Sequence, residues 1–351
     1  MRRKKQLVIR GRAIGNDQRP LVIAEIGINH EGSIRKAKKM IKDAHLAGAE
    51  CVKFQMHVIE DEMIPKAQKV IPGNAKESIW DIMKRCALSK EKHIKLKKYC
   101  EELGMIYLCT PFSRAAADIL KEMNVDAYKI GSGECNNYPL VKHIASFGKP
   151  VVLSTGMNNL MSISKSVNIL KKLDVPFALL HCTSMYPTPY DKVRLNGITE
   201  LKKKFKVPVG LSDHSIGIYT CLGAVALGAC IVEKHFTSDK SWPGPDVPIS
   251  IEPNELKELI KGANAIYEAL GGKKQILKEE KPTIDFAYAS VVTIKAVKKG
   301  EKFSLSNIWV KRPGTGKILA KDFKRILDKK AAKNLEKNIQ LEPTDIIGYE
   351  K

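Results

Sequence analysis

The sequence predicts a (β/α)8 barrel, the TIM-barrel fold, over residues 1–271, with a small second domain after it. Eight short apolar runs recur between residues 20 and 236, and a stretch with helical periodicity follows each of them. Strands that alternate with helices are typical of a parallel sheet covered by helices. Every run ends in polar residues, and the active site of such a barrel lies at the carboxyl ends of its strands. The runs are LVIAEIG, ECVKFQM, MIYLCT, AYKIGS, PVVLSTG, FALLHCT, PVGLSDH and CIVEKHF.

Side-chain alternation separates the strand residues that face the barrel interior from those that lie under the helices. Residues two apart in a strand share a face. The polar sets expected on the inward face are Glu25 with Gly27, Lys53 with Gln55, Ser212 with Gly210 and His214, and Glu233 with His235. A buried charge is costly unless it is paired or bound to a ligand. This segregation therefore indicates a binding site in the barrel mouth, and we expect an enzyme.

Two connections at the catalytic end of the barrel are unusual. The segment VIEDEMIPKAQKVIPGNAKESIWDIM after the second run is too long for an ordinary loop between a strand and a helix. Insertions of this kind commonly contact substrate. A Pro- and Gly-rich loop, FTSDKSWPGPDVPIS, follows the eighth run and precedes a helix predicted over Glu255–Leu270, which Gly271-Gly272 ends.

The rest of the chain is predicted to form a linker and a separate small domain. Residues 272–285 contain the polar stretch KKQILKEEKPT and are assigned to the linker. Residues 286–351 contain two strand-like runs, ASVVTIKAV and IWVKRPG, and a short helix near Lys321–Leu327. A domain of this size has a marginal core of its own, so we expect it to dock against another part of the assembly.

Length and composition favour a cytoplasmic enzyme. The 351 residues suffice for a barrel of roughly 250 residues and a second domain. No apolar stretch approaches the roughly 20 residues that span a bilayer, and the apolar LVIR after the basic start MRRKK is too short for a signal peptide. The eight cysteines include no CxxC pair, so neither a zinc knuckle nor a redox motif is indicated.

The net charge of +22 raises the alternative of a nucleic-acid-binding protein. Most of the excess is lysine on helical stretches such as KAKKMIKDAH and ELKKKF, which is typical of solvated helix faces. No nucleic-acid-binding motif with interleaved aromatics is present. A basic chain also raises the local concentration of anionic substrates. We therefore predict anionic small-molecule substrates, and neither nucleic acid nor membrane as a partner.

His214 and His235 form the strongest pair of candidate ligands. Both lie at strand ends on adjacent strands and face inward. A single histidine here would be a hydrogen-bonded structural residue, but two that converge at a barrel mouth favour a divalent metal. Two imidazoles leave open coordination positions, as a catalytic metal needs. Imidazole with oxygen ligands suits Mn²⁺, Fe²⁺, Co²⁺ or Zn²⁺.

A set of lysines and hydroxyls at the strand ends resembles a cradle for an anion. Ammonium groups supply point charges and hydroxyls supply hydrogen-bond donors, which fits phosphate. The alternative is pairing of the lysines with nearby glutamates, and the chemical rival is a lysine that forms a Schiff base. The set consists of Lys53, Lys129, Thr110, Ser132, Ser184 and Ser212.

Glu25 and Glu134 are the candidate general acids or bases. Glu134 follows a strand in the Gly-flanked segment GSGE, where it can reach a reacting group. A carboxylate among lysines normally stays ionised, so a base role is favoured over an acid role.

Taken together, the motifs resemble the N-acetylneuraminate (sialic acid) synthases over nearly the whole chain. The C-terminal part is similar to the antifreeze-like SAF domain of that family, a β-clip fold. The motifs are EIGINHEG, VKFQ, IPGN, CTPFS, KIGSGE, LSTGM, LLHCTSMYPTP, GLSDH, EKHFT with PGPD, and WVKRPGTG.

The resemblance implies that phosphoenolpyruvate condenses with N-acetylmannosamine and water to give N-acetylneuraminate and phosphate. It implies that His214 and His235 hold Mn²⁺, with Mg²⁺ or Co²⁺ as alternatives, and that the lysine and hydroxyl set holds phosphoenolpyruvate, with Lys129, Glu25 and Glu134 as catalytic residues. Arg312 would come from the partner in a domain-swapped homodimer. The residues implied to surround the sugar are Glu25, Gln55, Asn74, Glu134, Tyr186, Asp246, Phe286 and Arg312.

Two departures from the family and one rival substrate bear on these expectations. Ser184 stands where the sialic acid synthases carry Asn, and GTG follows Arg312-Pro313 where they carry GNG. The rival within the family is a legionaminate or pseudaminate synthase, which uses a 2,4-diacetamido-2,4,6-trideoxyhexose. That sugar lacks the 6-hydroxyl and carries a second acetamide, so polar contacts decide between the two.

Overall fold

A computed structural model describes residues 7–349 of the chain, and the basic start MRRKK lies outside them. The chain divides into two compact units, the first ending at Gly271 and the second beginning at Gly272. No helix within residues 7–349 is long and apolar enough to cross a membrane. All eight cysteines fall in the described part and are free and buried.

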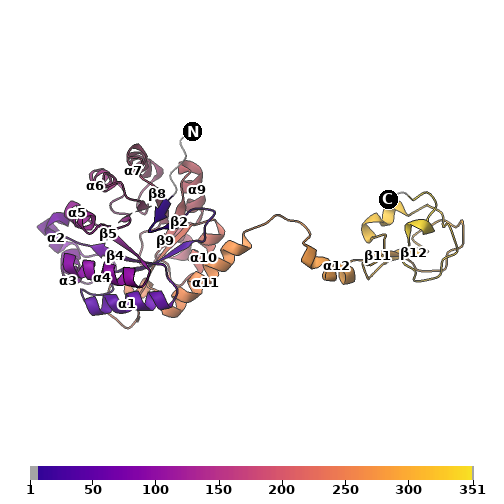
Figure 1. The fold of residues 1–351 in the computed structure, drawn as a ribbon, viewed down its shortest axis with the longest axis horizontal. Coiled ribbons are helices and arrows are strands. Elements are labelled where there is room, and N and C mark those ends of the chain that lie inside the picture. The colour runs from indigo at the N-terminus through magenta and orange to yellow at the C-terminus, as the bar shows by residue number, and fades with distance from the viewer. Residues whose placement is uncertain (1–6, 350–351) are drawn as a thin grey trace. The chain divides into compact units, whose positions relative to one another are not determined.

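The first unit is built on eight parallel strands within the described residues, in the order β5-β4-β3-β10-β9-β8-β7-β6. Helices surround these strands on all sides (Figure 1). Each strand coincides with one of the apolar runs, so the predicted (β/α)8 barrel is confirmed. The strands are β3 Leu21–Gly27, β4 Cys51–Met56, β5 Ile106–Pro111, β6 Tyr128–Ile130, β7 Val151–Ser154, β8 Phe177–Cys182, β9 Val209–Asp213 and β10 Ile231–His235.

The barrel interior is apolar toward the amino ends of the strands and polar toward their carboxyl ends. Small and branched side chains such as Ile23, Leu108, Val152 and Leu180 fill the lower layers as one buried cluster. The next inward residue toward the carboxyl end of each of these strands is Glu25, Thr110, Ser154 and Cys182. Period-two alternation in a strand therefore carries the polar residues into the mouth, as the sequence predicts.

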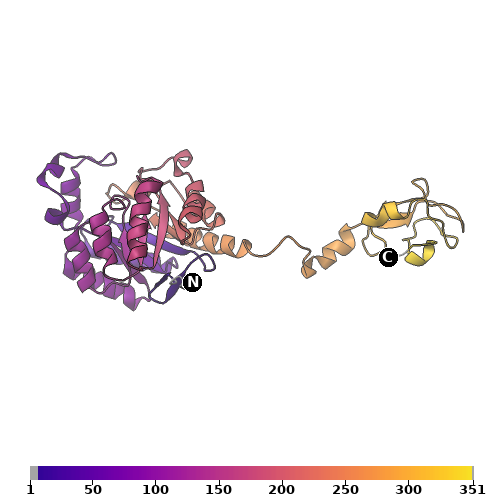
Figure 2. The same cartoon turned by 90° about the horizontal axis from the view of Figure 1, so that it is seen from above.

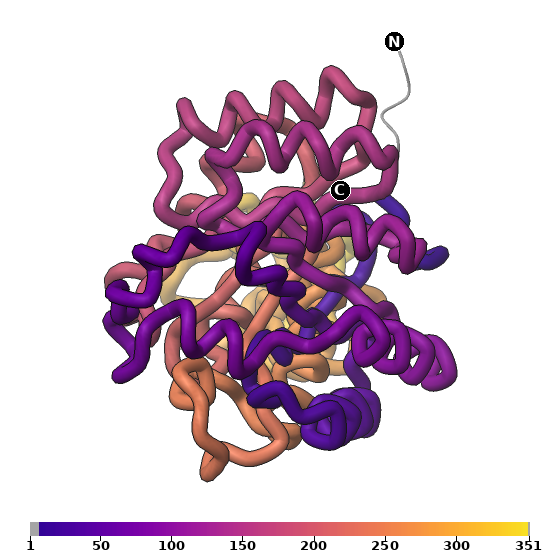
Figure 3. Tube along the Cα trace, turned by 90° about the vertical axis from the view of Figure 1, so that its left-hand side faces the viewer, coloured from indigo at the N-terminus to yellow at the C-terminus, as the bar shows by residue number. Residues whose placement is uncertain are grey.

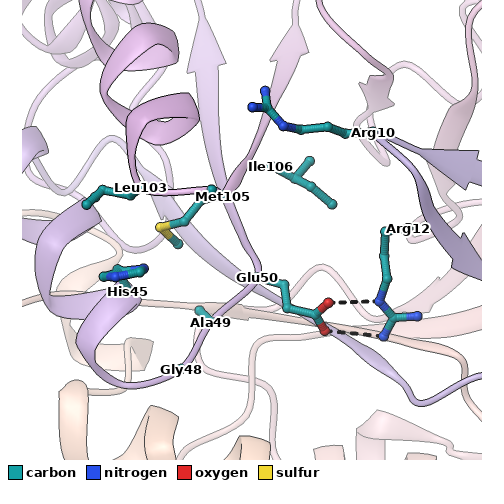
Figure 4. Close-up of a pocket in the computed structure, with 10 residues that line it drawn as sticks. Arg10, Arg12, His45, Gly48, Ala49, Glu50, Leu103, Met105 and Ile106 are labelled. Carbon is teal, nitrogen blue, oxygen red and sulfur yellow. Dashed lines mark hydrogen bonds and ion pairs between the residues drawn. The ribbon is translucent and has the colours of Figure 1, made fainter.

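A short N-terminal hairpin closes the lower end of the barrel. Strands β1 (Leu7–Ile9) and β2 (Arg12–Ile14) pair antiparallel, and their apolar side chains join the interior cluster. Figure 4 shows a cavity beside the hairpin. In it, Arg12 donates through Nε and Nη2 to the two carboxylate oxygens of Glu50. Arg10 lies 3.2 Å from Glu101. Both arginines of this cavity therefore have carboxylate partners.

Several of the outer helices begin at side-chain caps, and the outer helices bury apolar residues against the strands. Ser33, Ser89 and Ser113 accept backbone N–H groups at the starts of their helices, as capping residues do. These buried residues form a continuous core with the outward residues of the strands. These helices are α1 Ile34–Leu46, α4 Lys90–Glu102, α5 Arg114–Glu122, α6 Tyr138–Ala145, α7 Leu160–Lys172, α8 Tyr190–Val193, α9 Asn196–Phe205, α10 Tyr219–Ala226 and α11 Pro253–Ala269.

The two unusual connections lie near the mouth. The insertion after β4 holds α2 (Ile59–Glu62), a 3₁₀ turn and α3 (Ile79–Cys86), and it stands out from the helical ring in Figure 2. The loop after β10 lies beside α1 (Figure 3). There the Lys36 Nζ lies over the Trp242 ring, 4.8 Å from its centroid. Asn74 of the insertion donates to the carbonyl of Pro245 at 3.3 Å, which joins the two segments.

The second unit has its own small core. Strands β11 (Ser290–Thr293) and β12 (Ile308–Lys311) pair antiparallel and pack with buried residues such as Phe303 and Ile318. The helix expected near 321–327 is a 3₁₀ helix at Ala320–Arg325. The assigned linker is not wholly irregular, since Lys278–Glu280 is a 3₁₀ turn and α12 covers Lys281–Ala287.

Candidate active site

A cavity of about 350 Å³ opens at the carboxyl ends of the barrel strands. Strand ends and the loops that follow them contribute its walls, as expected for this fold. Most of the predicted site residues line it together, although their roles stay predictions. The predicted residues found there are Glu25, Lys53, Gln55, Thr110, Lys129, Ser132, Glu134, Ser184, Tyr186, Ser212, His214 and His235.

Two lysines and two glutamates form a buried ionic network on the cavity floor. Lys53 Nζ lies 2.8 Å from Glu25 and 3.8 Å from Glu233, and Lys129 Nζ lies 3.4 Å from Glu233. Ser212 donates to Glu233 at 3.0 Å. Although burial opposes ionisation, the Lys129 and Lys53 ammonium groups hold the pKa of Glu233 below its ordinary value. Burial lowers the pKa of Lys129, whereas the Glu233 and Glu25 carboxylates raise the pKa of Lys53 although burial opposes the shift. These contacts are those of the alternative in which the lysines pair with glutamates.

Hydroxyl groups lie beside the same lysines. Lys53 donates to Thr110 at 3.2 Å, and Lys129 donates to Ser154 at 2.8 Å. Ser132 accepts the backbone N–H of Gly156 at 3.0 Å. A Cβ at Gly156 would lie 2.4 Å from the Ser184 hydroxyl and 2.8 Å from the Ser132 hydroxyl, so glycine lets both hydroxyls keep their positions. Fixed donors beside two cations are what an anionic group such as phosphate needs.

The two histidines face each other at the rim. Their ring centroids are 5.3 Å apart, and the Tyr186 ring lies 4.2 Å from that of His214. His214 Nδ1 is 3.0 Å from the carbonyl of Thr183, which orients its ring. His235 Nδ1 is buried without a hydrogen-bond partner among the described residues, and its nearest carboxylate, Asp246, is 3.8 Å away.

This pair fits a divalent metal. Burial lowers the pKa of His235 well below its ordinary value, which favours the neutral ring that a metal ligand needs. The pKa of His214 is raised, because Cys182 outweighs the opposing effect of burial. Among the described residues, no group of three or more His, Cys, Asp or Glu side chains is arranged to hold a metal ion. An ion at this point would therefore have few protein ligands and would keep open positions for substrate oxygens.

The carboxylates differ from the expectation that they stay ionised. Burial raises the pKa of Glu134 to about 7, and the Glu62 carboxylate adds to the shift. One of its oxygens has no hydrogen-bond partner among the described residues. Burial also raises the pKa of Glu25 despite the Lys53 ammonium beside it. A pKa near 7 suits a general acid as well as a general base, so the base role of Glu134 stays a prediction.

The remaining predicted sugar residues are not among those that line the cavity. Asp246 is buried beside His235, and Asn74 binds the loop that carries Asp246. Phe286 and Arg312 belong to the second unit, and the Phe286 side chain is 63% exposed. These two residues therefore belong to a different unit from the residues that line the cavity.

The cavity also contains residues that the sequence prediction did not assign to the site. Alternation placed Glu233 on the inward face with His235, but no role was predicted for it. Ser154 and Cys182 are inward strand ends of the same kind. His57 had no such signal: it lies 3.2 Å from Gln55 and 2.8 Å from Glu62, and so links the insertion to the cavity wall.

Comparison with known proteins agrees with this arrangement. The NeuB family matches residues 40–275, and the SAF domain matches residues 288–347. The chain is 40% identical over 330 residues to an N,N'-diacetyllegionaminic acid synthase of Campylobacter jejuni, covering 92% of this chain and 98% of the relative. It is 36% identical over 308 residues to the N-acetylneuraminate-9-phosphate synthase of Homo sapiens, covering 86% and 85%.

A solved structure shows the same fold. The N-acetylneuraminic acid synthetase of Leptospira borgpetersenii superposes with a TM-score of 0.74 at 34% identity, over 80% of this chain and 95% of that one. Both the resemblance inferred from the motifs and the prediction of an enzyme are confirmed. The chain therefore belongs to the NeuB family of sialic-type acid synthases, and its barrel is followed by an SAF domain.

Proposed function

We propose that the enzyme condenses phosphoenolpyruvate with the open-chain form of N-acetylmannosamine and with water, giving N-acetylneuraminate and phosphate. The observation that carries this proposal is the single cavity in which two buried lysines face two histidines and two protonatable glutamates. The lysine side suits a phosphate and a carboxylate, and the histidine side suits a sugar aldehyde. Family membership supports the reaction class.

Phosphoenolpyruvate binds on the Lys53 and Lys129 side of the cavity in this proposal. Both ammonium groups already contact carboxylates, so the anion must share or replace those contacts. Ser132, Ser212 and Thr110 supply neutral donors that carry no charge cost. A buried cation that changes partners rather than losing them avoids most of the desolvation penalty.

The chemistry then needs two proton transfers at opposite ends of the new bond. The enol carbon of phosphoenolpyruvate attacks the aldehyde carbon, and the aldehyde oxygen takes a proton to become a hydroxyl. Water adds to the former enol-phosphate carbon and loses a proton. The C–O bond to phosphate then breaks as the hydroxyl of the adduct becomes the keto group, and the hydroxyl proton leaves with phosphate. Glu134, protonated near neutral pH, supplies the first proton, and Glu25 takes the second. A divalent ion held by His214 and His235, Mn²⁺ by preference, would supply Lewis acidity toward the aldehyde.

Phosphate release from phosphoenolpyruvate tests the proposed function. We expect release that depends on N-acetylmannosamine and Mn²⁺ and is lost after chelation. In H₂¹⁸O the released phosphate should carry no label, because the C–O bond breaks rather than the P–O bond. Labelled phosphate, or release without any sugar, would show that the enzyme merely hydrolyses the ester.

A second candidate substrate is a 2,4-diacetamido-2,4,6-trideoxyhexose. It is favoured by the 40% identity to a relative named for N,N'-diacetyllegionaminic acid. A site that binds a hydroxyl rejects the analogue that lacks it by several orders of magnitude. The ratio of kcat/KM for the two sugars therefore decides which one is the substrate.

Lys129→Met tests the placement of the two substrates. We expect the KM for phosphoenolpyruvate to rise about 10- to 150-fold with little change for the sugar, because one charge-assisted contact is worth about 1.5–3 kcal/mol. Lys149→Met, which removes only a surface contact to Asn124, is the matched control. A defect confined to the sugar KM would reverse the placement. Trapping of substrate on Lys129 by borohydride would support a Schiff base instead.

The pH profile tests the role of Glu134. If Glu134 must be protonated, its active form is lost as the pH rises through its pKa. The value of kcat/KM should therefore fall above pH about 7. Glu134→Gln should lower the rate about 10²- to 10⁴-fold and remove this descending limb. A wild-type rate that instead rises through pH 7, with the rise lost in Glu134→Gln, would assign the residue as a base.

The active assembly in this proposal is a domain-swapped homodimer. Phe286 and Trp309 leave 63% and 50% of their side chains exposed on a unit with a small core, which supports docking to another surface. Arg312 is exposed on the same unit and can meet an anionic or hydroxyl-rich sugar. The partner subunit would thus complete each barrel mouth.

A further inference from the structure

A second buried ion pair lies behind the two histidines, on the outer face of the barrel. Asp213 and Lys234 are direct register partners of the parallel strands β9 and β10. Lys234 Nζ lies 2.6 Å from Asp213 Oδ2, and the side chains are 0% and 1% exposed. Each residue immediately precedes one of the histidines, His214 and His235. Because strand residues alternate, the ion pair faces outward while the histidines face the cavity.

The ion pair is tied to the backbone on both sides of His214. Lys234 Nζ also donates to the carbonyl of Ser215, and the Ser215 hydroxyl donates to Asp213 at 2.9 Å. The Ser215 hydroxyl lies 2.8 Å from that of Thr220, and the Cys221 thiol donates to Asp213 at 3.6 Å. The network therefore joins the end of β9, the end of β10 and the start of α10.

Stability alone does not explain these charges. The outward residues on either side of Lys234, Val232 and Phe236, belong to the apolar core beneath the helices. A buried ion pair is often no more stabilising than well-packed apolar residues, and its best-attested use is to select one arrangement. The arrangement selected here is the relative position of the ends of β9 and β10.

His235 depends on that arrangement more than His214 does. His214 has a carbonyl acceptor, whereas His235 Nδ1 has no hydrogen-bond partner among the described residues. The position of the His235 ring is thus determined by its backbone, which the Lys234 contacts hold from behind. Groups behind the ligands commonly change metal affinity 10- to 100-fold.

We propose that Asp213 and Lys234 form an ionic clamp, supported by Ser215, that positions His214 and His235 to bind one divalent ion. They are positioning residues, since neither reaches the cavity. The inference rests on the proposed function only in taking the two histidines as metal ligands.

The test measures Mn²⁺ binding directly rather than turnover. The double variant Asp213→Leu with Lys234→Met removes both charges together and fills the same space with apolar side chains. Titration calorimetry gives the Kd for Mn²⁺, and electron spin echo spectroscopy gives the nitrogen coupling from bound imidazole. Arg12→Leu with Glu50→Met removes an ion pair at the opposite end of the barrel and is the matched control. His235→Ala defines loss of the site.

We expect the double variant to stay folded, with its Kd for Mn²⁺ raised about 10- to 100-fold and its imidazole coupling weakened. The control should bind as the wild type does. Wild-type affinity and coupling in the double variant would overturn the clamp while leaving the metal assignment intact. If His235→Ala leaves the Mn²⁺ binding of the wild type unchanged, or if the wild type binds no Mn²⁺, both the clamp and the metal assignment are overturned.

A milder variant keeps the proposal testable if the double variant does not fold. Ser215→Ala removes the hydroxyl that links Asp213 to Thr220 and leaves both charges paired. A smaller rise in Kd, with unchanged melting temperature, would support the clamp. Unchanged affinity in this variant would contradict it.

Discussion

His235→Ala should abolish Mn²⁺ binding and lower turnover at least about a thousandfold. The variant removes one of the two imidazoles that face the cavity, and Lewis-acid activation is worth several kcal/mol, each 1.4 kcal/mol being a factor of ten. The barrel should remain folded, because the side chain lies at a strand end and makes no hydrogen bond through its buried Nδ1. Calorimetric titration with Mn²⁺, phosphate release and circular dichroism measure the three quantities.

The matched control is His143→Ala, on α6, which removes a histidine that pairs with Asp118 outside the cavity. This variant should keep both metal and turnover. A chelator-treated His235→Ala enzyme with full activity, unchanged by added Mn²⁺, would mean that turnover needs neither a metal nor the His235 imidazole. The lysine side of the cavity would then carry the chemistry alone.

Strand alternation was the most informative feature of the sequence. Each of the eight runs has one apolar face and a second face that ends in polar residues. Because side chains alternate along a strand and the active site lies at the carboxyl ends of barrel strands, the runs define both the barrel and the residues of its mouth. The same rule places Glu233 on the inward face with His235, although the resemblance implies no role for it.

Other features depend on contacts that sequence patterns do not carry. The pKa of Glu134 follows from burial in the assembled mouth, so the sequence suggested an ionised group where the fold raises the pKa to about 7. The Asp213–Lys234 pair sits at outward positions where apolar residues are expected, and only the register between β9 and β10 brings the charges together. The N-terminal hairpin was missed because its strands, each three residues long, carry almost no periodic signal.

Arg312 gives a direct test of the quaternary proposal. If the second unit of one subunit completes the barrel mouth of its partner, then Arg312 acts in trans. Arg312→Ala and His235→Ala subunits should each be inactive as homodimers. A heterodimer of the two, co-expressed and isolated through two different tags, should show about half of the wild-type activity per dimer, since one of its two composite sites retains both residues.

The control is a heterodimer of His214→Ala with His235→Ala subunits. Both lesions then lie in barrels, so neither site is intact whether the second unit docks in trans or in cis, and no activity should return. If Arg312 acts in cis, the Arg312→Ala and His235→Ala heterodimer should be equally inactive, because every subunit carries one lesion. Normal sugar KM and turnover in the Arg312→Ala homodimer would show instead that the second unit takes no part in the site. Recovery in the first heterodimer alone requires that a barrel from one chain and Arg312 from the other meet at one substrate.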